Sequence, residues 1–367
     1  TESPMAGRDC GNSYRVDRDA RLVDVPQFPI TGPLSMIVLL VDFSDNIGHR
    51  PRSEYAEMLF SAETFATGSL RDYYQEVSGG RVDVTGTVHG WLRMPKTYAY
   101  YVDNKSGVDG VYPRNAQKLA EDAVVVAKSQ GISFPASLDK LGTSAITALF
   151  IVHAGPGAEV IRPPLQKRRI WSHKAPLASP VEVAPDLWAT TYLTVPEDSR
   201  VGVCAHELGH LAFQWDDFYD PNYAEDGSQW DGSGNWDLMA GGSYNGAGHR
   251  PAHPAGLHKS QHGWVTVETI VASRTGVRIP PYDASGGKVV RVVGPRFRTT
   301  QALILENRRK QGFDADLSGE GLLVWRVDTR LKQINADHPA MYLVQADGNH
   351  ELDRPEDFNT GDAGDPF

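Results

Sequence analysis

The sequence predicts a protein of the α/β (α+β) class, with a twisted mixed sheet, a backing helix and a second region rich in loops and strands. Two uninterrupted apolar runs of strand length, residues 35–43 and 145–153, are typical of buried strands. Residues 115–129 place apolar side chains at helical spacing, as in a helix that covers a sheet. Strands and helices alternate through this part of the chain, and that order favours the α/β class.

The N-terminal lobe is expected over residues 34–217, after a polar, proline-containing arm at residues 1–33. Ser69 suits the N-cap of a short helix over residues 69–77, and the glycines that follow suit its end. The helix that contains residues 206–210 is expected to open at residues 196–199, where acidic side chains in the first turn would suit the helix dipole. The other strands expected in this lobe are residues 81–88, 170–173 and 189–195.

The C-terminal lobe is expected over residues 218–367, and a cleft is expected between the two lobes of one domain. Residues 219–253 are rich in Gly, Asp, Asn and Trp and lack periodicity, and ordered loops of this length are usually functional. A short helix at residues 254–262, closed by Gly263, comes next. Strands are then expected at residues 289–293, 302–306 and 322–327.

Composition excludes two classes of partner. The formal net charge is −10, which argues against nucleic acid because phosphate binding requires a basic face. No apolar run approaches the length that spans a bilayer, so no membrane span is expected. The chain opens without the pattern of a signal peptide, so we expect a mature fragment whose targeting segment is absent.

The stretch His206-Glu207-Leu208-Gly209-His210 is the main chemical signal. Residues four apart lie on one face of a helix, so His206 and His210 can hold one metal ion. Glu207 is then placed to act on a metal-bound water, as in the HExxH pattern of zinc peptidases. The alternative is a surface helix with polar side chains, but the apolar neighbours of these residues indicate a buried helix.

Two histidines leave a tetrahedral zinc ion short of one protein ligand. Asp216 and Asp217 both lie just beyond the helix, and either could fold back onto the metal. The spacing within this segment leaves the choice between them open.

Residues 206–220, together with Gly-Asn-Trp-Asp-Leu-Met at residues 234–239, resemble the M6 family of secreted metallopeptidases (immune inhibitor A-like), which are metzincin-type zinc endopeptidases. The resemblance covers most of the chain from about residue 37. Further stretches that resemble the family are residues 73–80, 170–173, 321–325 and 345–348, and Lys259 with residues 263–264.

The resemblance implies a zincin fold, with His206 and His210 as zinc ligands, Glu207 as general base and Met239 as the Met-turn residue beneath the metal. Matching the family's Asp-x-Tyr-Asp ending favours Asp217 as third ligand, whereas the commoner spacing would give Asp216. The family usually places a glycine in the turn between helix and third ligand.

This chain differs from the family pattern at that turn. Neither Phe213 nor Gln214 is glycine, and a non-glycine residue in a left-handed conformation costs about 1 kcal/mol or more.

The resemblance implies a secreted zinc endopeptidase that hydrolyses peptide bonds of protein or peptide substrates. We expect the protein to be a monomer.

 Tyr244 follows the Met-turn residue in sequence, and this position makes it a candidate to stabilise the oxyanion. A rival from another class is a catalytically silent zincin that serves as an adhesin or binding module. The intact Glu207 argues against that rival, since a silent scaffold has no chemical need for the base.

Two further features carry predictions. Cys10 and Cys204 are the two cysteines, and we expect them to form a disulfide; free thiols, or a Cys10 thiolate that blocks the zinc, are the alternatives. A solvated acidic loop and a structural Ca²⁺ site are equally compatible with four aspartates that lie among glycines near the C-terminus. These aspartates are Asp347, Asp353, Asp362 and Asp365. The histidines at positions 249, 253, 258 and 262 are expected to serve packing rather than a second metal.

Overall fold

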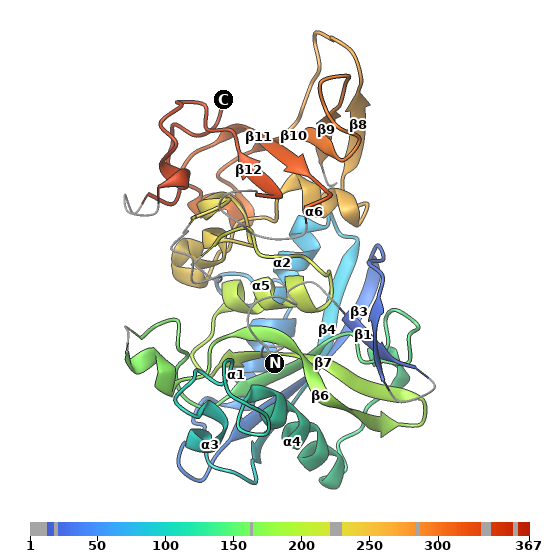
Figure 1. The fold of residues 1–367 in the computed structure, drawn as a ribbon, viewed down its shortest axis with the longest axis vertical. Helices are drawn as coiled ribbons and strands as arrows, with labels where there is room; N and C mark the ends of the chain where they lie inside the picture. The colour runs from blue at the N-terminus through green and yellow to red at the C-terminus, as the bar shows by residue number, and fades with distance from the viewer. Residues whose placement is uncertain are drawn as a thin grey trace.

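The computed structural model describes residues 13–17, 21–161, 164–220, 230–282, 287–331, 339–354 and 359–367. Within these ranges the chain folds into one two-stranded sheet, two five-stranded sheets and several helices (Figure 1). The predicted mixed α/β class is therefore confirmed, and the architecture is consistent with a zincin-like metallopeptidase.

The first five-stranded sheet has the order β4-β3-β5-β7-β6. Its strands run parallel except β6, which pairs antiparallel with β7 and forms one edge. This is the mixed sheet that the sequence predicts. The strands are β3 (Gly32–Asp42), β4 (Val82–Arg93), β5 (Leu149–His153), β6 (His173–Ala184) and β7 (Leu187–Pro196).

Helices cover both faces of this sheet, which explains why its central strands read as continuous apolar runs. Side chains alternate between the faces of a strand. Along β3, Met36 and Val38 lie in the core that contains α2 and α5, whereas Ile37 and Leu39 lie in the core that contains α4. The helices are α2 (Leu70–Val77), α4 (Ala116–Ser129) and α5 (Val201–Leu211).

The second five-stranded sheet has the order β12-β11-β10-β9-β8, and in Figure 1 it lies above α5. The helix α6 (Gly256–Gln261) precedes it, and Gly263 with a φ of +67° follows that helix, as predicted. The strands are β8 (Thr266–Ile270), β9 (Lys288–Val292), β10 (Gln301–Arg308), β11 (Gly321–Asp328) and β12 (Met341–Leu343).

The described part of the N-terminal arm has structure that the sequence analysis did not predict. The strands β1 (Ser13–Val16) and β2 (Leu22–Val25) form an antiparallel hairpin. Thr190 Oγ1 of β7 donates a hydrogen bond to Tyr14 O at 2.7 Å, and Ile30 is 1% exposed. The segment therefore packs against the first sheet.

Two local predictions are wrong. Residues 170–172 are not a strand, because their backbone bonds go to loops: Trp171 N donates to Ser106 O, and β6 begins only at His173. The helix that contains residues 206–210 has no acidic first turn, because it begins at Val201. Glu197 instead accepts hydrogen bonds from the backbone N–H groups of three residues in other loops, namely His49, Arg50 and Gly155.

The sequence predicted the helix α2 but not the helices α1 and α3. Ser69 caps α2 in a capping box with Asp72, as its sequence position predicts. The helices α1 (Arg52–Phe60) and α3 (Tyr98–Val102) were not predicted, since both are short and their apolar residues do not follow a clear helical period. Within the described ranges, no helix combines the length and hydrophobicity that crossing a membrane requires.

Candidate metal centre

The helix α5 lies in the core with every residue buried except Val203, which is partly exposed. It packs against α2, and Tyr74 of α2 donates a hydrogen bond from its hydroxyl to Ala205 O at 2.7 Å. This bond lies one residue before His206. The predicted burial of the helix is confirmed, and the histidines on it therefore need polar partners.

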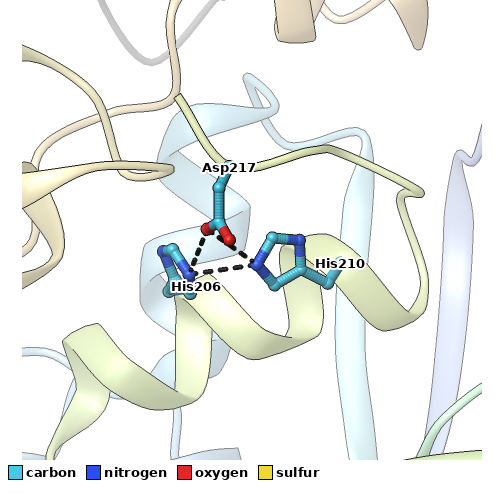
Figure 2. Close-up of side chains that lie close together, drawn as sticks. All are labelled: His206, His210 and Asp217. Carbon is cyan, nitrogen blue, oxygen red and sulfur yellow. Dashed lines mark hydrogen bonds and ion pairs between the residues drawn. The ribbon is translucent and has the colours of Figure 1, made fainter. Parts of the chain in front are cut away.

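Three potential metal ligands meet above α5. His206 and His210 project from successive turns of the helix, and Asp217 approaches them from the segment that follows (Figure 2). The two Nε2 atoms are 3.0 Å apart, and Asp217 Oδ1 lies 3.0 Å from that of His206 and 3.1 Å from that of His210. The three residues are 8%, 2% and 3% exposed, in chain order.

Backbone carbonyls orient both imidazole rings. His206 Nδ1 donates to Leu238 O at 2.9 Å, and His210 Nδ1 donates to Trp215 O at 2.6 Å. A histidine held in this way directs Nε2 at the metal and keeps it free of a proton when neutral. The hydrogen-bond partners therefore suit both rings to ligate through Nε2.

The donor set fits a zinc ion. Ligand atoms around tetrahedral zinc, with bonds of about 2.0–2.1 Å, lie about 3.3 Å from one another. The three atoms here are within a few tenths of an ångström of that separation. Three electron pairs converging so closely repel one another unless a cation or a proton lies among them.

In the metal-free protein a proton can take that place. Burial alone would lower the pKa of His206, but the hydrogen bond and charge of Asp217 outweigh it and raise that pKa to about 9. Burial opposes ionisation of Asp217 as well, yet the two histidines hold its pKa well below the usual range. Asp217 therefore keeps its negative charge at neutral pH, paired with the proton that His206 carries in the metal-free protein.

Glu207 has an unusual carboxyl environment. The residue is 5% exposed, and its Oε2 atom is buried and has no hydrogen-bond partner among the described residues. Burial raises its pKa to about 8, and the positive charge of a protonated His206 opposes this increase. A carboxyl group whose pKa lies near neutrality can both accept and return a proton.

The structure brings Asp217, rather than Asp216, to the two histidines. Asp217 is buried, while Asp216 is partly exposed and does not belong to the cluster of potential ligands. The turn between helix and aspartate has the left-handed residue that the sequence analysis expects: Gln214 has a φ of +57°. The aspartate that lies beside the histidines is the one that the sequence analysis favours as third ligand.

Met239 lies directly beneath the helix. It is 0% exposed, and its backbone carbonyl accepts a hydrogen bond from Phe218 N at 2.9 Å. Gly209 allows this close packing, because a Cβ there would lie 2.8 Å from Met239 Sδ and 3.0 Å from Trp215 Cε3. This is where a Met-turn residue is expected to lie.

Tyr244 and Cys204 have different outcomes. Tyr244 exposes 55% of its surface, and desolvation of its hydroxyl raises its pKa, with smaller contributions from the charges of Glu159, Glu207 and Asp217. The Cys204 side chain is buried, with its Sγ 3.7 Å from Ser199 Oγ. Cys10 lies outside the described residues, so the predicted disulfide stays a prediction.

The C-terminal acidic residues divide into two sets. Asp347 and Asp362 lie near Glu351, a residue that the sequence analysis missed, in a group that could hold an ion. Asp353 and Asp365 do not belong to that group; they accept hydrogen bonds from the indole N–H groups of Trp230 and Trp236. The four-aspartate calcium site is thus not assembled as predicted.

Three of the four histidines that follow the Met-turn residue, namely His253, His258 and His262, serve packing and hydrogen bonding, as predicted. His253 bonds Glu76 through Nε2 at 2.8 Å, and His258 stacks on Trp215 with ring centroids 5.0 Å apart. His262 receives a hydrogen bond from Ile30 N at Nδ1 and bonds Phe213 O through Nε2.

Sequence reasoning missed several groups that shape the centre. The carbonyls of Leu238 and Trp215 orient the histidines, but backbone groups leave no trace in residue identities. Glu159 was also missed. Its charge acts on both Glu207 and Tyr244, and its loop precedes the edge strand β6, so only the folded chain reveals its position.

Comparisons with known proteins agree with this geometry. The model of the family described as immune inhibitor A peptidase M6, catalytic domain, matches residues 36–269, which is more than half of the chain. Immune inhibitor A of Bacillus thuringiensis subsp. alesti is 32% identical over 254 residues, which cover 58% of this chain. Pre-pro-metalloprotease PrtV of Vibrio cholerae serotype O1 is 30% identical over 226 residues, which cover 53% of this chain.

The chain is much shorter than these relatives. The matched region covers 36% of the immune inhibitor A and 24% of PrtV. The similarity therefore concerns the region that contains the candidate metal centre.

Proposed function

The chain belongs to the M6 peptidase family, and from this premise we propose that it is a zinc-dependent endopeptidase that hydrolyses peptide bonds of protein substrates. The observation that carries the proposal is the convergence of three buried ligand atoms beside a buried carboxyl group. His206, His210 and Asp217 supply the ligand atoms, and Glu207 supplies the carboxyl group.

His206, His210 and Asp217 would hold the metal, with Met239 beneath it. Imidazole nitrogen and carboxylate oxygen are donors that zinc prefers, and three protein ligands leave a position for water, as in catalytic zinc sites. When bound, zinc lowers the pKa of its water and polarises the scissile carbonyl.

Glu207 would act as general base and then as general acid. Its Oε2 atom accepts the proton of the attacking water, and the same atom later donates it to the leaving amine. In the metal-free protein, burial raises the pKa of this carboxyl group to about 8, and the charge of a bound cation would lower it again. Tyr244 would stabilise the oxyanion from the loop that follows the Met-turn.

Extended substrate would pair with the edge of the first sheet. Two strands are candidates, the one that contains Thr194 and the one that begins after Trp171. Thr194 belongs to β7, which already pairs with β5 and β6, so its backbone groups are occupied. The edge strand β6, which begins two residues after Trp171, is the better candidate for main-chain pairing.

The wider description remains part of the proposal. We propose an N-terminal lobe at residues 34–217 and a C-terminal lobe at residues 218–367, with the substrate between them. The two five-stranded sheets, one from each part of the chain, support this division. Family membership supports secretion, and we expect the protein to act as a monomer.

Metal content and hydrolysis of casein, measured on the same sample with and without 1,10-phenanthroline, test the proposal. One zinc ion per chain and cleavage that the chelator abolishes are expected. In Glu207→Gln, zinc should stay bound while kcat falls by about 10²–10⁴-fold, because the general base is lost. Glu57→Gln, on the exposed face of α1, is the matched control. Zinc without any cleavage would favour the silent-scaffold alternative.

A further inference from the structure

The turn that delivers Asp217 to the histidines has an unfavourable backbone conformation. Gln214 has a φ of +57°, in the left-handed region that glycine adopts readily and other residues avoid. It lies between the last helical ligand, His210, and Asp217. The conformation of this turn determines where the Asp217 carboxylate can lie.

The N-terminal hairpin and the residues after it hydrogen-bond this turn. Gln214 Nε2 donates to Val25 O at 3.0 Å, and Gln27 Nε2 donates in return to Phe213 O at 3.2 Å. Ser13 Oγ donates to Leu211 O, the last residue of α5, at 3.3 Å. These bonds join segments nearly two hundred residues apart in sequence.

These contacts compensate for two costs. The last carbonyls of a helix lack partners within it, and Ser13 supplies one for α5. Gln214 is itself the residue with the unfavourable φ, so its side-chain hydrogen bond to Val25 O helps to hold that backbone conformation. Trp215, the next residue, accepts the bond from His210 Nδ1, so the turn also orients a ligand ring.

From this geometry we infer that Gln27 and Gln214 are positioning residues for the metal centre, through which the N-terminal segment holds the third ligand in place. The inference rests on the proposed metal site. In the absence of glycine at this turn, contacts from the start of the chain hold the conformation that the metal requires.

The test measures zinc affinity in the full chain rather than activity. Gln27→Leu removes one donor. Gln214→Asn shortens the other, and asparagine still tolerates a left-handed φ. The zinc dissociation constant is measured by competition with a chromophoric chelator, and each variant should bind zinc about 2- to 12-fold more weakly, the factor that one hydrogen bond supports.

A spectroscopic readout separates positioning from simple stability. The visible spectrum of bound Co²⁺ reports ligand geometry, so it should change in Gln27→Leu and Gln214→Asn even where the metal-free proteins unfold at the same denaturant concentration as the parent. Gln130→Leu is the matched control, because Gln130 is an exposed glutamine after α4, far from the turn in sequence. It should leave both affinity and spectrum unchanged.

Unchanged zinc affinity and unchanged Co²⁺ spectra in both variants would overturn the inference, and so would an equal effect of Gln130→Leu. Failure of the proposed function is distinguishable from this result. A parent protein that takes up no zinc would overturn the metal site itself, whereas a zinc-binding parent with unaffected variants would overturn only the role of the two glutamines.

Discussion

Two groups of three potential ligands occur in the described residues, and they differ in almost every physical property. His206, His210 and Asp217 are all buried, and backbone carbonyls orient both histidine rings. In the second group, Asp347 is exposed, and Glu351 and Asp362 are partly exposed. In both groups the ligand atoms are close together. Only in the first group are the ligand residues buried and the ligand rings oriented by backbone hydrogen bonds.

Local hydrogen bonds already serve the second group. Asn349 donates to both carboxylate oxygens of Asp347, from its backbone N and its Nδ2. Asp362 accepts from Gly364 N at 2.7 Å, and this bond, followed by one from Asn359, lowers its pKa. These carboxylates are stable without an ion. The comparison teaches that burial and oriented ring nitrogens, rather than closeness of ligand atoms alone, distinguish the first group as a metal site.

The largest expected effect separates the two adjacent aspartates. Asp217→Asn should weaken zinc binding by roughly 100-fold or more, since about 10–16 kcal/mol of zinc binding is shared among a few ligands. Asp216→Asn makes the same chemical change one residue earlier and should alter affinity by about threefold or less. Zinc dissociation constants of the two folded variants check the prediction, and similar losses in both would contradict it.

The close packing beneath α5 predicts the next effect. Gly209→Ala should lower the free energy of unfolding by about 1–3 kcal/mol, because the new Cβ would crowd Met239 and Trp215. Gly348 follows Asp347 of the second ligand group, which we call the acidic group (Asp347, Glu351 and Asp362). A Cβ at Gly348 would meet no atom within 4 Å, so Gly348→Ala should lower the free energy of unfolding by about 1 kcal/mol through its positive φ alone. Urea unfolding of both variants measures the difference. A larger loss in Gly348→Ala would contradict this account.

Acidification should lower the free energy of unfolding through His262, whose ring contacts Phe213 and Trp215 in the turn after α5. Burial lowers the pKa of His262 to about 4. Its Nδ1 accepts a hydrogen bond from Ile30 N, which requires that this nitrogen carry no proton. The unfolded chain has a pKa of about 6.5 here, so it binds more protons than the folded chain below that pH. Stability is therefore lost as the pH falls from 6.5 toward 4, by about 2 kcal/mol at pH 5 for this group.

Urea unfolding of the metal-free protein at pH 7 and pH 5 checks that loss. His262→Gln keeps an acceptor and a donor but cannot titrate, so it should reduce the loss. His350→Gln is the control, because the His350 side chain, paired with Asp353, is exposed, whereas that of His262 is buried. An equal pH dependence in His262→Gln and the parent protein would exclude His262 as the cause.

Calcium should give the smallest effect. One oxygen of Glu351 lacks a hydrogen-bond partner within the described ranges, so weak binding is expected at the acidic group. With a dissociation constant near 1 mM, as in weak extracellular sites, about 10 mM Ca²⁺ would stabilise the fold by about 1.4 kcal/mol. A shift of the unfolding midpoint well above this value would show a tighter site than the geometry indicates.

The sequence predicted the elements whose signals are local. The apolar run at residues 35–43, the Ser69 cap and the helix around His206 all depend on neighbours within a few residues, and all are present. The two short helices α1 and α3 and the hairpin of β1 and β2 were not predicted, because their stability depends on packing against distant segments. Glu197 was misassigned for the same reason.

The sequence by itself determined that two histidines and a glutamate share one buried helix, since four residues make about one helical turn whatever surrounds them. Tertiary structure alone decided that Asp217 reaches them, that Met239 packs against the same helix at Gly209 and that Glu351 lies with Asp347 and Asp362. The physical reason is that a turn such as that at Gln214 has several possible conformations, and hydrogen bonds from distant residues select one of them.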